Sequence, residues 1–227
     1  MTNLYLHYFK SSNIERRKEL DYCVRKNISN PLIDKIYLLL ENGKDVQMWM
    51  QSDKVVIVDT NKRMNFHDIF EYSNSVENDD INIITNLDMF FDDSLSKLKE
   101  HSLDNTFLAL SRWDIDVKTK QANLFNVNCS QDSWIWKGKI DLNKIDVKYS
   151  LGKPGCDNSI CGEFHNNGYL VINPCLDIKT YHLHQDTSRA YTDNDVVRKK
   201  LYLLYPSKDW TKTTIQYWKD CTNFVES

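Results

Sequence analysis

The sequence has few of the residues that divide chains into separate pieces, and it has no long apolar run. Its 227 residues include only 6 glycines and 4 prolines, and no stretch rich in glycine, serine or proline marks a linker between domains. No apolar run approaches the roughly 20 residues that a transmembrane helix needs. The first residues, MTNLYLHYFKSSN, hold too short an apolar stretch for a secretory signal. We therefore expect one cytoplasmic domain over residues 1–227, without an integral membrane segment.

The sequence also lacks an excess of charge of one sign and a disulfide framework. Its 29 basic residues are balanced by 32 acidic ones, for a net charge of −3. The basic residues are scattered along the chain, which argues against nucleic acid as a partner. A chain of this length does not need its 6 cysteines as disulfide staples. Cys156, Cys161 and His165 follow no common zinc-ligand spacing and lack a fourth ligand, so we expect buried free thiols.

What the sequence does contain is an alternation of strand-like and helix-like segments. Short segments rich in apolar, β-branched and aromatic residues predict strands at 3–9, 33–41, 54–60, 81–85, 106–116, 169–174 and 178–184, with 132–140 as a strand or a loop edge. Apolar residues at helical spacing predict helices at 12–29, 65–76, 94–102 and 158–168, the first capped by Ser12, and a weakly helical tail from 192. This alternation predicts a Rossmann-like α/β fold with a mixed, mostly parallel central sheet flanked by helices.

The stretch INIITNLDMFFDDSL, residues 81–95, places polar residues directly after a buried strand. Asn86 and Asp88 are two residues apart, so in an extended segment their side chains share one face. An amide and a carboxylate oxygen suit a hard cation such as Mg²⁺ or Mn²⁺, and open α/β sheets bind ligands at the carboxyl ends of their strands. The alternative is structural, because Asn-x-Asp pairs are frequent and acids after a strand also cap helices. Asp92 and Asp93 fit a helix start better than a metal cluster.

A pair of histidines lies in the segment TYHLHQD. His182 and His184 project to one face of the predicted strand, in a chain that has only 6 histidines. The alternative for either one is a hydrogen-bonded core residue. One carboxylate and one imidazole from a distant strand would hold Mn²⁺ and leave coordination positions for a diphosphate.

Two further segments combine acids with turn residues or aromatics. In LGKPGCDN the glycines and the proline build a turn that presents Asp157 and Asn158 just ahead of a helix. Asp157 is there either a helix N-cap or a carboxylate that accepts a hydrogen bond from a substrate hydroxyl. In SQDSWIW, Asp132 stands two residues before Trp134. Aromatics beside an acid suit sugar rings, but such tryptophans also belong in cores.

In chain order, these segments resemble the small GT-A-fold glycosyltransferase domains of large algal (chlorella) viruses and bacterial polysaccharide loci. The resemblance is carried by NLYLHYF, IITNLDMFFDDSL, LALSRWD, SQDSWIWKGKI, LGKPGCDNSICGEFHNNGYLVINP and IKTYHLH. It covers about residues 3–191 and leaves residues 191–227 as a C-terminal extension. It implies a GT-A-like fold and, for a viral protein, the host cytoplasm.

The resemblance also implies an activity. The chain is expected to be a metal-dependent hexosyl- or deoxyhexosyl-transferase that uses a nucleotide-diphosphate sugar, most simply a UDP-sugar, and a glycan acceptor. Asp88, with Asn86 beside it, is then assigned to Mn²⁺ (or Mg²⁺) and the diphosphate. The strand that carries His182 and His184 becomes the source of another metal ligand.

The remaining donor contacts are expected at the end of the predicted strand 3–9 and after the predicted strand 54–60. Tyr8 and Phe9 would frame the base, and Arg63 would contact the nucleotide or a phosphate. Two other functions stay open. One is a metal-dependent phosphohydrolase, and the other is a non-catalytic module that binds a nucleotide or a glycan.

Four residues are expected on the acceptor side. Asp157 is the candidate for orienting or deprotonating the acceptor hydroxyl, with Asp132 as the second choice. Trp134 and Asn158 are the candidate acceptor contacts.

Overall fold

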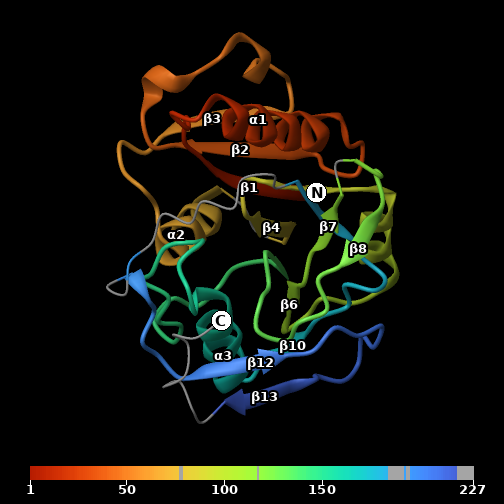
Figure 1. Ribbon diagram of the computed structural model, residues 1–227. Coiled ribbons are helices and arrows are strands. Elements are labelled where there is room, and N and C mark those ends of the chain that lie inside the picture. The colour runs from red at the N-terminus through yellow and green to blue at the C-terminus, as the bar shows by residue number, and fades with distance from the viewer. Residues whose placement is uncertain (77–78, 117, 184–191, 193–194, 219–227) are drawn as a thin grey trace.

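A seven-stranded sheet forms the centre of the protein in the computed structural model, which describes residues 1–76, 79–116, 118–183, 192 and 195–218 (Figure 1). In spatial order its strands are β10 (Leu170–Ile172), β6 (Thr106–Leu110), β9 (Ser133–Lys137), β4 (Ile81–Thr85), β1 (Thr2–Tyr8), β2 (Lys35–Leu40) and β3 (Val55–Asp59). Neighbouring strands pair in parallel except at β9, which is antiparallel to both β4 and β6. The predicted α/β fold with a mixed, mostly parallel sheet is confirmed.

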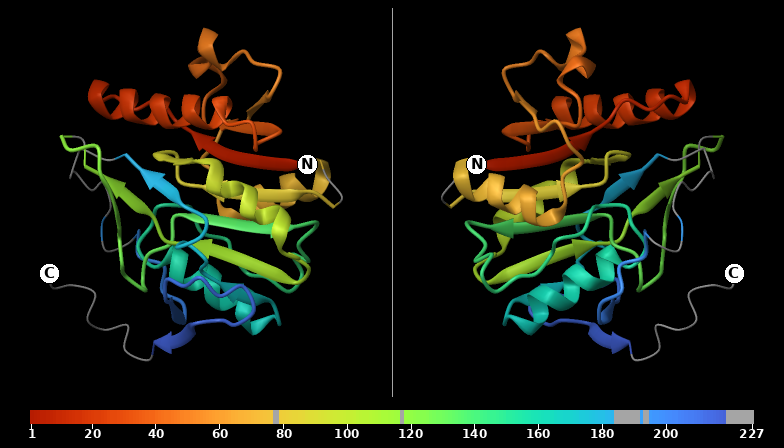
Figure 2. Two further views of the ribbon diagram at one scale, coloured as in Figure 1. Left: turned by 90° about the vertical axis from the view of Figure 1, so that its right-hand side faces the viewer. Right: turned by 90° about the vertical axis from the view of Figure 1, so that its left-hand side faces the viewer.

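Helices cover both faces of this sheet (Figure 2). The helices of the protein are α1 (Ile14–Ser29), α2 (Phe66–Val76), α3 (Cys156–Asn166) and the 3₁₀ helices η1 (Gly43–Asp45), η2 (Met48–Met50) and η3 (Asp93–Glu100). One apolar cluster joins α1 and η3 to one face, and a second joins α2 and α3 to the other. Successive residues of a strand point to opposite faces, so Leu4 and Leu6 of β1 enter the first cluster and Tyr5 enters the second.

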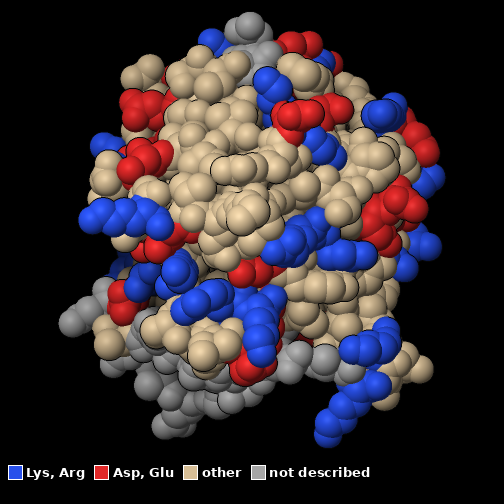
Figure 3. Space-filling model, turned by 90° about the horizontal axis from the view of Figure 1, so that it is seen from above, with Lys and Arg blue, Asp and Glu red and all other residues tan. Residues whose placement is uncertain are grey.

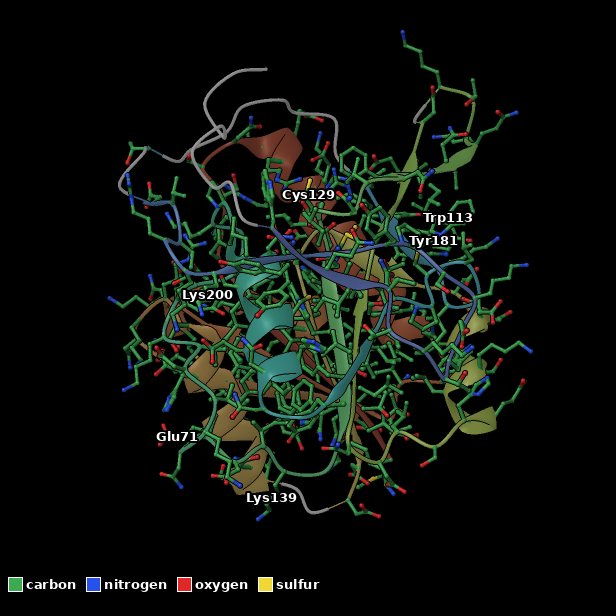
Figure 4. All side chains as sticks on the ribbon, turned by 90° about the horizontal axis from the view of Figure 1, so that it is seen from below. Glu71, Trp113, Cys129, Lys139, Tyr181 and Lys200 are labelled. Atoms are coloured by element: carbon green, nitrogen blue, oxygen red, sulfur yellow. The ribbon has the colours of Figure 1, made fainter. Side chains whose placement is uncertain are left out.

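A second, smaller sheet lies beside the first. Its order is β5 (Met89–Phe91), β11 (Thr180–His182), β7 (Trp113–Ile115) and β8 (Ala122–Leu124). Tyr181 pairs in register with Trp113, and the two side chains lie next to each other in Figure 4. In the same sheet His182 pairs with Met89 on one side and with Asp114 on the other. The second sheet therefore brings three distant segments of the chain together at one point.

Several local predictions are corrected by the structure. The predicted strand 106–116 is two strands in different sheets, β6 and β7. The first helix is capped by Asn13 rather than Ser12, because the Asn13 side chain accepts hydrogen bonds from the backbone of Glu15 and Arg16. The predicted helix at 94–102 is the 3₁₀ helix η3.

The tail also differs from its weakly helical prediction. It forms an antiparallel hairpin of β12 (Leu201–Leu204) and β13 (Ile215–Trp218). The hairpin packs closely on α3, where a Cβ atom on Gly162 would lie 2.2 Å from the Tyr202 ring. Cys23, Cys156, Cys161 and Cys175 are free and buried, as expected, whereas Cys129 is free but only partly buried. Within the described part of the chain, no helix is long and apolar enough to cross a membrane.

Candidate functional site

A connected set of charged and polar side chains lies at the edge of the main sheet where β4 and β6 end and β9 begins. We call it the site network, and its members are Arg16, Glu19, Asn86, Asp88, Arg112, Asp114, Asp132 and His182. They come from α1, the turn after β4, the loop after β6, β7, the residue before β9, and β11. Carboxyl ends of parallel strands meet at one edge, which is where open α/β sheets bind ligands.

Asp88 is a buried acid near the centre of the site network, with a side chain that is 12% exposed. Its Oδ2 accepts a hydrogen bond from Arg16 Nη2 at 2.5 Å and lies 3.2 Å from His182 Nε2. Burial alone would raise the pKa of Asp88, but the contacts with His182 and Arg16 outweigh it and hold that pKa well below its usual range. Asp88 is therefore a carboxylate at any physiological pH.

His182 lies between two carboxylates. Its Nδ1 is 2.7 Å from Asp114 Oδ1, and its Nε2 faces Asp88. Burial lowers the pKa of His182, but the contacts with Asp114 and Asp88 outweigh it and raise that pKa to about 9. At neutral pH the unliganded protein thus holds an imidazolium here, with one N–H directed at each acid.

Arg112 links Asp114, which contacts His182, to Asp132. Its Nε donates to Asp114 at 2.8 Å and its Nη1 donates to Asp132 at 3.0 Å. Its guanidinium also lies 4.1 Å from the centre of the Phe125 ring. Asn86 donates from Nδ2 to the other Asp132 oxygen at 2.8 Å. Arg112 and Asn86 therefore fix the Asp132 carboxylate from two sides.

The prediction that Asn86 and Asp88 share one face is wrong. The chain turns at this point, with the Met89 amide donating to the Asn86 carbonyl at 3.2 Å. Asn and Asp favour such turns because their short polar side chains compete with regular backbone pairing. As a result Asn86 faces Asp132, whereas Asp88 faces Arg16 and His182.

Asp157 lies in the first turn of α3 and is half-buried. It is not the N-cap, because that position is taken by Gly155 with φ of +80°. Its carboxylate accepts hydrogen bonds from the backbone amides of Gln131 at 3.1 Å and Asn158 at 3.2 Å. Burial and the negative charge of Asp132 raise the pKa of Asp157 to about 7. Asp157 is therefore a carboxyl group poised to exchange a proton near neutral pH.

Three other predicted contacts are corrected because the side chains are buried. Trp134 is 0% exposed and packs edge-on against Phe66, with ring centres 4.8 Å apart. Asn158 is 1% exposed and donates to the Tyr202 carbonyl at 2.8 Å. Neither side chain reaches an acceptor. Tyr8 is 1% exposed and its hydroxyl donates to an acid of α1, so its ring does not face a nucleotide base.

Phe9 and Arg63 remain candidates for contacts with the donor. Phe9 follows β1 at the site edge of the sheet and is 39% exposed. Arg63 donates to the Leu151 carbonyl at 2.8 Å. Burial lowers the pKa of His7 to about 4, and the positive charge of Arg63 is the second cause. His184 lies outside the described residues.

Sequence reasoning missed Arg16, Arg112 and Asp114. Arg112 and Asp114 follow a buried strand in SRWD, much as Asn86 and Asp88 follow one in TNLD. Polar residues after a strand were thus a usable signal for that pair. Arg16 gave none, because a basic residue in the first turn of an amphipathic helix is expected on any solvated face.

Asp88 and His182 have the spacing of two neighbouring ligands of one divalent cation. Among the described residues, no three or more His, Cys, Asp or Glu side chains form a ready metal site. Two neighbouring ligands of an octahedral cation, each about 2.1 Å from it, lie about 3 Å apart, and Asp88 Oδ2 and His182 Nε2 are 3.2 Å apart. Asp114 on the other ring nitrogen is the carboxylate that typically orients a metal-bound imidazole. A cation there requires His182 to lose its Nε2 proton.

Other surfaces of the protein carry less that points to chemistry. A hollow of about 530 Å³ lies at the opposite edge of the main sheet, and Met1, Thr2 and Ile81 at the start of β1 and β4 line it. Basic and acidic residues are interspersed on the face seen in Figure 3. The site network is therefore the strongest candidate site among the described residues.

No family model and no curated protein matches the chain. Solved structures with a similar course include HddC from Yersinia pseudotuberculosis, at 14% identity and a TM-score of 0.43 over 66% of this chain and 82% of that one. They also include the 2-C-methyl-D-erythritol 4-phosphate cytidylyltransferase IspD of Francisella tularensis (19%, 0.35, 60% and 70%) and the mannose-6-phosphate isomerase of Helicobacter pylori (18%, 0.38, 74% and 65%). Similarity at these TM-scores supports no inference about activity.

Proposed function

We propose that the protein is a metal-dependent glycosyltransferase. It would transfer a hexosyl or deoxyhexosyl group from a nucleotide-diphosphate sugar, most simply a UDP-sugar, to a hydroxyl of a glycan. The observation that carries the proposal is the arrangement of Asp88, His182 and Asp114 at the carboxyl edge of the sheet. It combines one buried carboxylate, one imidazole at ligand spacing and a second carboxylate that orients the imidazole.

In this proposal Asp88 and His182 hold Mn²⁺ or Mg²⁺, which keeps its other coordination positions for water and the two phosphates. The cation would supply Lewis-acid stabilisation of the departing diphosphate. Asp114 would keep the proton on Nδ1, so that the Nε2 lone pair faces the cation. Phe9 and Arg63, at the end of β1 and after β3, would contact the nucleotide.

Asp157 would act on the acceptor. A general base works best when its pKa is near the working pH, because it is then both ionised and basic enough to take a proton. The Asp157 pKa of about 7 meets that condition. Asp157 would take the proton of the acceptor hydroxyl as that oxygen attacks the sugar. Asp132 would be a positioning residue, because its negative charge raises the pKa of Asp157. Arg112 and Asn86 hold the Asp132 carboxylate in place.

The proposal is tested by the melting temperature of the whole protein with UDP, ADP and no nucleotide, each with Mn²⁺ and with EDTA. We expect UDP to raise the melting temperature only in the presence of Mn²⁺, because a ligand that binds the folded state stabilises it. No effect of any nucleotide would contradict the proposal.

Among the described residues, no arrangement of acids favours the phosphohydrolase alternative. The candidate acids for such a site are the neighbours Asp92 and Asp93. Asp92 is instead the N-cap of η3, where it accepts a hydrogen bond from the Ser94 amide. A Mn²⁺-dependent UDP effect without transfer to any glycan would point instead to a non-catalytic binding module.

A further inference from the structure

Arg16 contacts the Asp88 oxygen that would hold a metal ion, so Arg16 would have to move away when a metal ion binds. Its Nη2 donates to Asp88 Oδ2 at 2.5 Å, and its Nη1 donates to Glu19 Oε2 at 3.1 Å. The side chain is only 20% exposed, and Glu19 is 6% exposed. The Asp88 oxygen that Arg16 contacts is the same one that faces His182.

A cation and the Arg16 guanidinium compete for that oxygen. A cation about 2.1 Å from Oδ2 would lie within about 5 Å of Nη2, since Nη2 is 2.5 Å from Oδ2. Two positive groups at that distance repel strongly in a partly buried site, where screening by water is weak. The cation therefore binds well only if Arg16 gives up Asp88 or a further anion neutralises both.

We propose that Arg16 is a switch between Asp88 and the donor diphosphate, an inference that rests on the proposed function. Without a donor, Arg16 pairs with Asp88 and keeps the cation position closed. When the donor arrives with its cation, the guanidinium leaves Oδ2, stays anchored on Glu19 and pairs with a phosphate.

Two features favour a phosphate as the new partner. The planar fork of an arginine matches two phosphate oxygens at once. Arg16 also belongs to the first turn of α1, a helix of 16 residues, and the amino end of a helix attracts phosphate groups. The consequence is that the cation and the nucleotide bind interdependently, each weakly on its own.

The test is calorimetry on the full chain, with Mn²⁺ alone as one titrant and UDP in saturating Mn²⁺ as the other. Arg16→Gln should bind Mn²⁺ alone roughly tenfold more tightly than the wild type, because the competing charge is gone. It should bind UDP roughly 10- to 100-fold more weakly, as expected for a lost charge-assisted hydrogen bond. Arg25→Gln is the matched control, because Arg25 lies on the same helix and stacks on Trp49 at 4.4 Å.

The opposite signs separate a switch from a structural role, which would weaken both titrations. Equal weakening of both, or no change in either while the wild type binds UDP, overturns the switch and leaves the proposed function intact. A wild type that shows no Mn²⁺-dependent UDP binding overturns both. If Arg16→Gln does not fold, Arg16→Lys decides the matter. It keeps the charge without the fork, so Mn²⁺ affinity should stay near the wild-type value while UDP affinity falls, and unchanged UDP affinity refutes the switch.

Discussion

His182 should make the stability of the metal-free protein fall as the pH rises above neutrality. Its pKa is about 9 in the folded protein, against 6.5 for an ordinary histidine. The folded state therefore holds the proton more tightly than the unfolded state, so the stabilisation is complete below about pH 6.5 and is lost as the pH rises through about 9. At about 1.4 kcal/mol for each pKa unit, the contribution is about 3 kcal/mol, of which roughly 2 kcal/mol disappears between pH 6.5 and 8.5.

Urea unfolding at pH 6.5, 7.5 and 8.5 measures this loss. The wild type in EDTA should lose roughly 2 kcal/mol more than His182→Gln over that interval, even though the variant starts from lower stability. His165→Gln, at the end of α3 and outside the site network, is the control and should retain the wild-type pH dependence. Equal losses in the wild type and in His182→Gln would refute the assignment of His182 as an imidazolium held between Asp88 and Asp114.

Two further predictions concern the acids around this centre. Asp157→Asn removes the basicity at nearly constant size, so UDP binding should persist while glycosyl transfer falls by roughly two to four powers of ten; near-normal turnover would reduce Asp157 to a structural role in the first turn of α3. Asp114→Asn should weaken Mn²⁺ binding roughly 10- to 100-fold in calorimetry, as for other losses of a carboxylate behind a metal-bound imidazole, whereas Asp116→Asn, outside the site network, should leave it unchanged.

The strands of the main sheet were the most predictable part of the fold. The apolar runs of β1, β2, β4 and β6 are buried on both faces, and such runs stand out in the sequence without knowledge of their partners. The break between β6 and β7 did not stand out, because TFLALSRWDID reads as one apolar segment. It is divided by pairing, since β6 joins β9 and β10 whereas β7 joins β8 and β11.

The candidate site was predictable where its residues follow a strand directly or lie two residues apart within one. Asp88 and His182 were both chosen from the sequence, and they lie 3.2 Å apart although 94 residues separate them. Arg112 and Asp114 also follow a strand, but their contacts with Asp132 and His182 depend on how the second sheet packs. The contact of Arg16 with Asp88 depends on how α1 packs, which no local pattern encodes. Trp134 was misassigned for a similar reason, because β9 lies in the middle of the sheet under α2 and α3.

The proposed function depends most on Asp88 as the carboxylate that holds a divalent cation and, through it, the diphosphate of the donor. The most direct measurement is calorimetry of UDP with saturating Mn²⁺ on the wild type and on Asp88→Ala, with urea unfolding of both to show that the variant folds cooperatively. We expect Mn²⁺-dependent UDP binding in the wild type and its loss in folded Asp88→Ala, because the cation loses the carboxylate proposed to hold it. Retained metal-dependent UDP affinity in Asp88→Ala would contradict it.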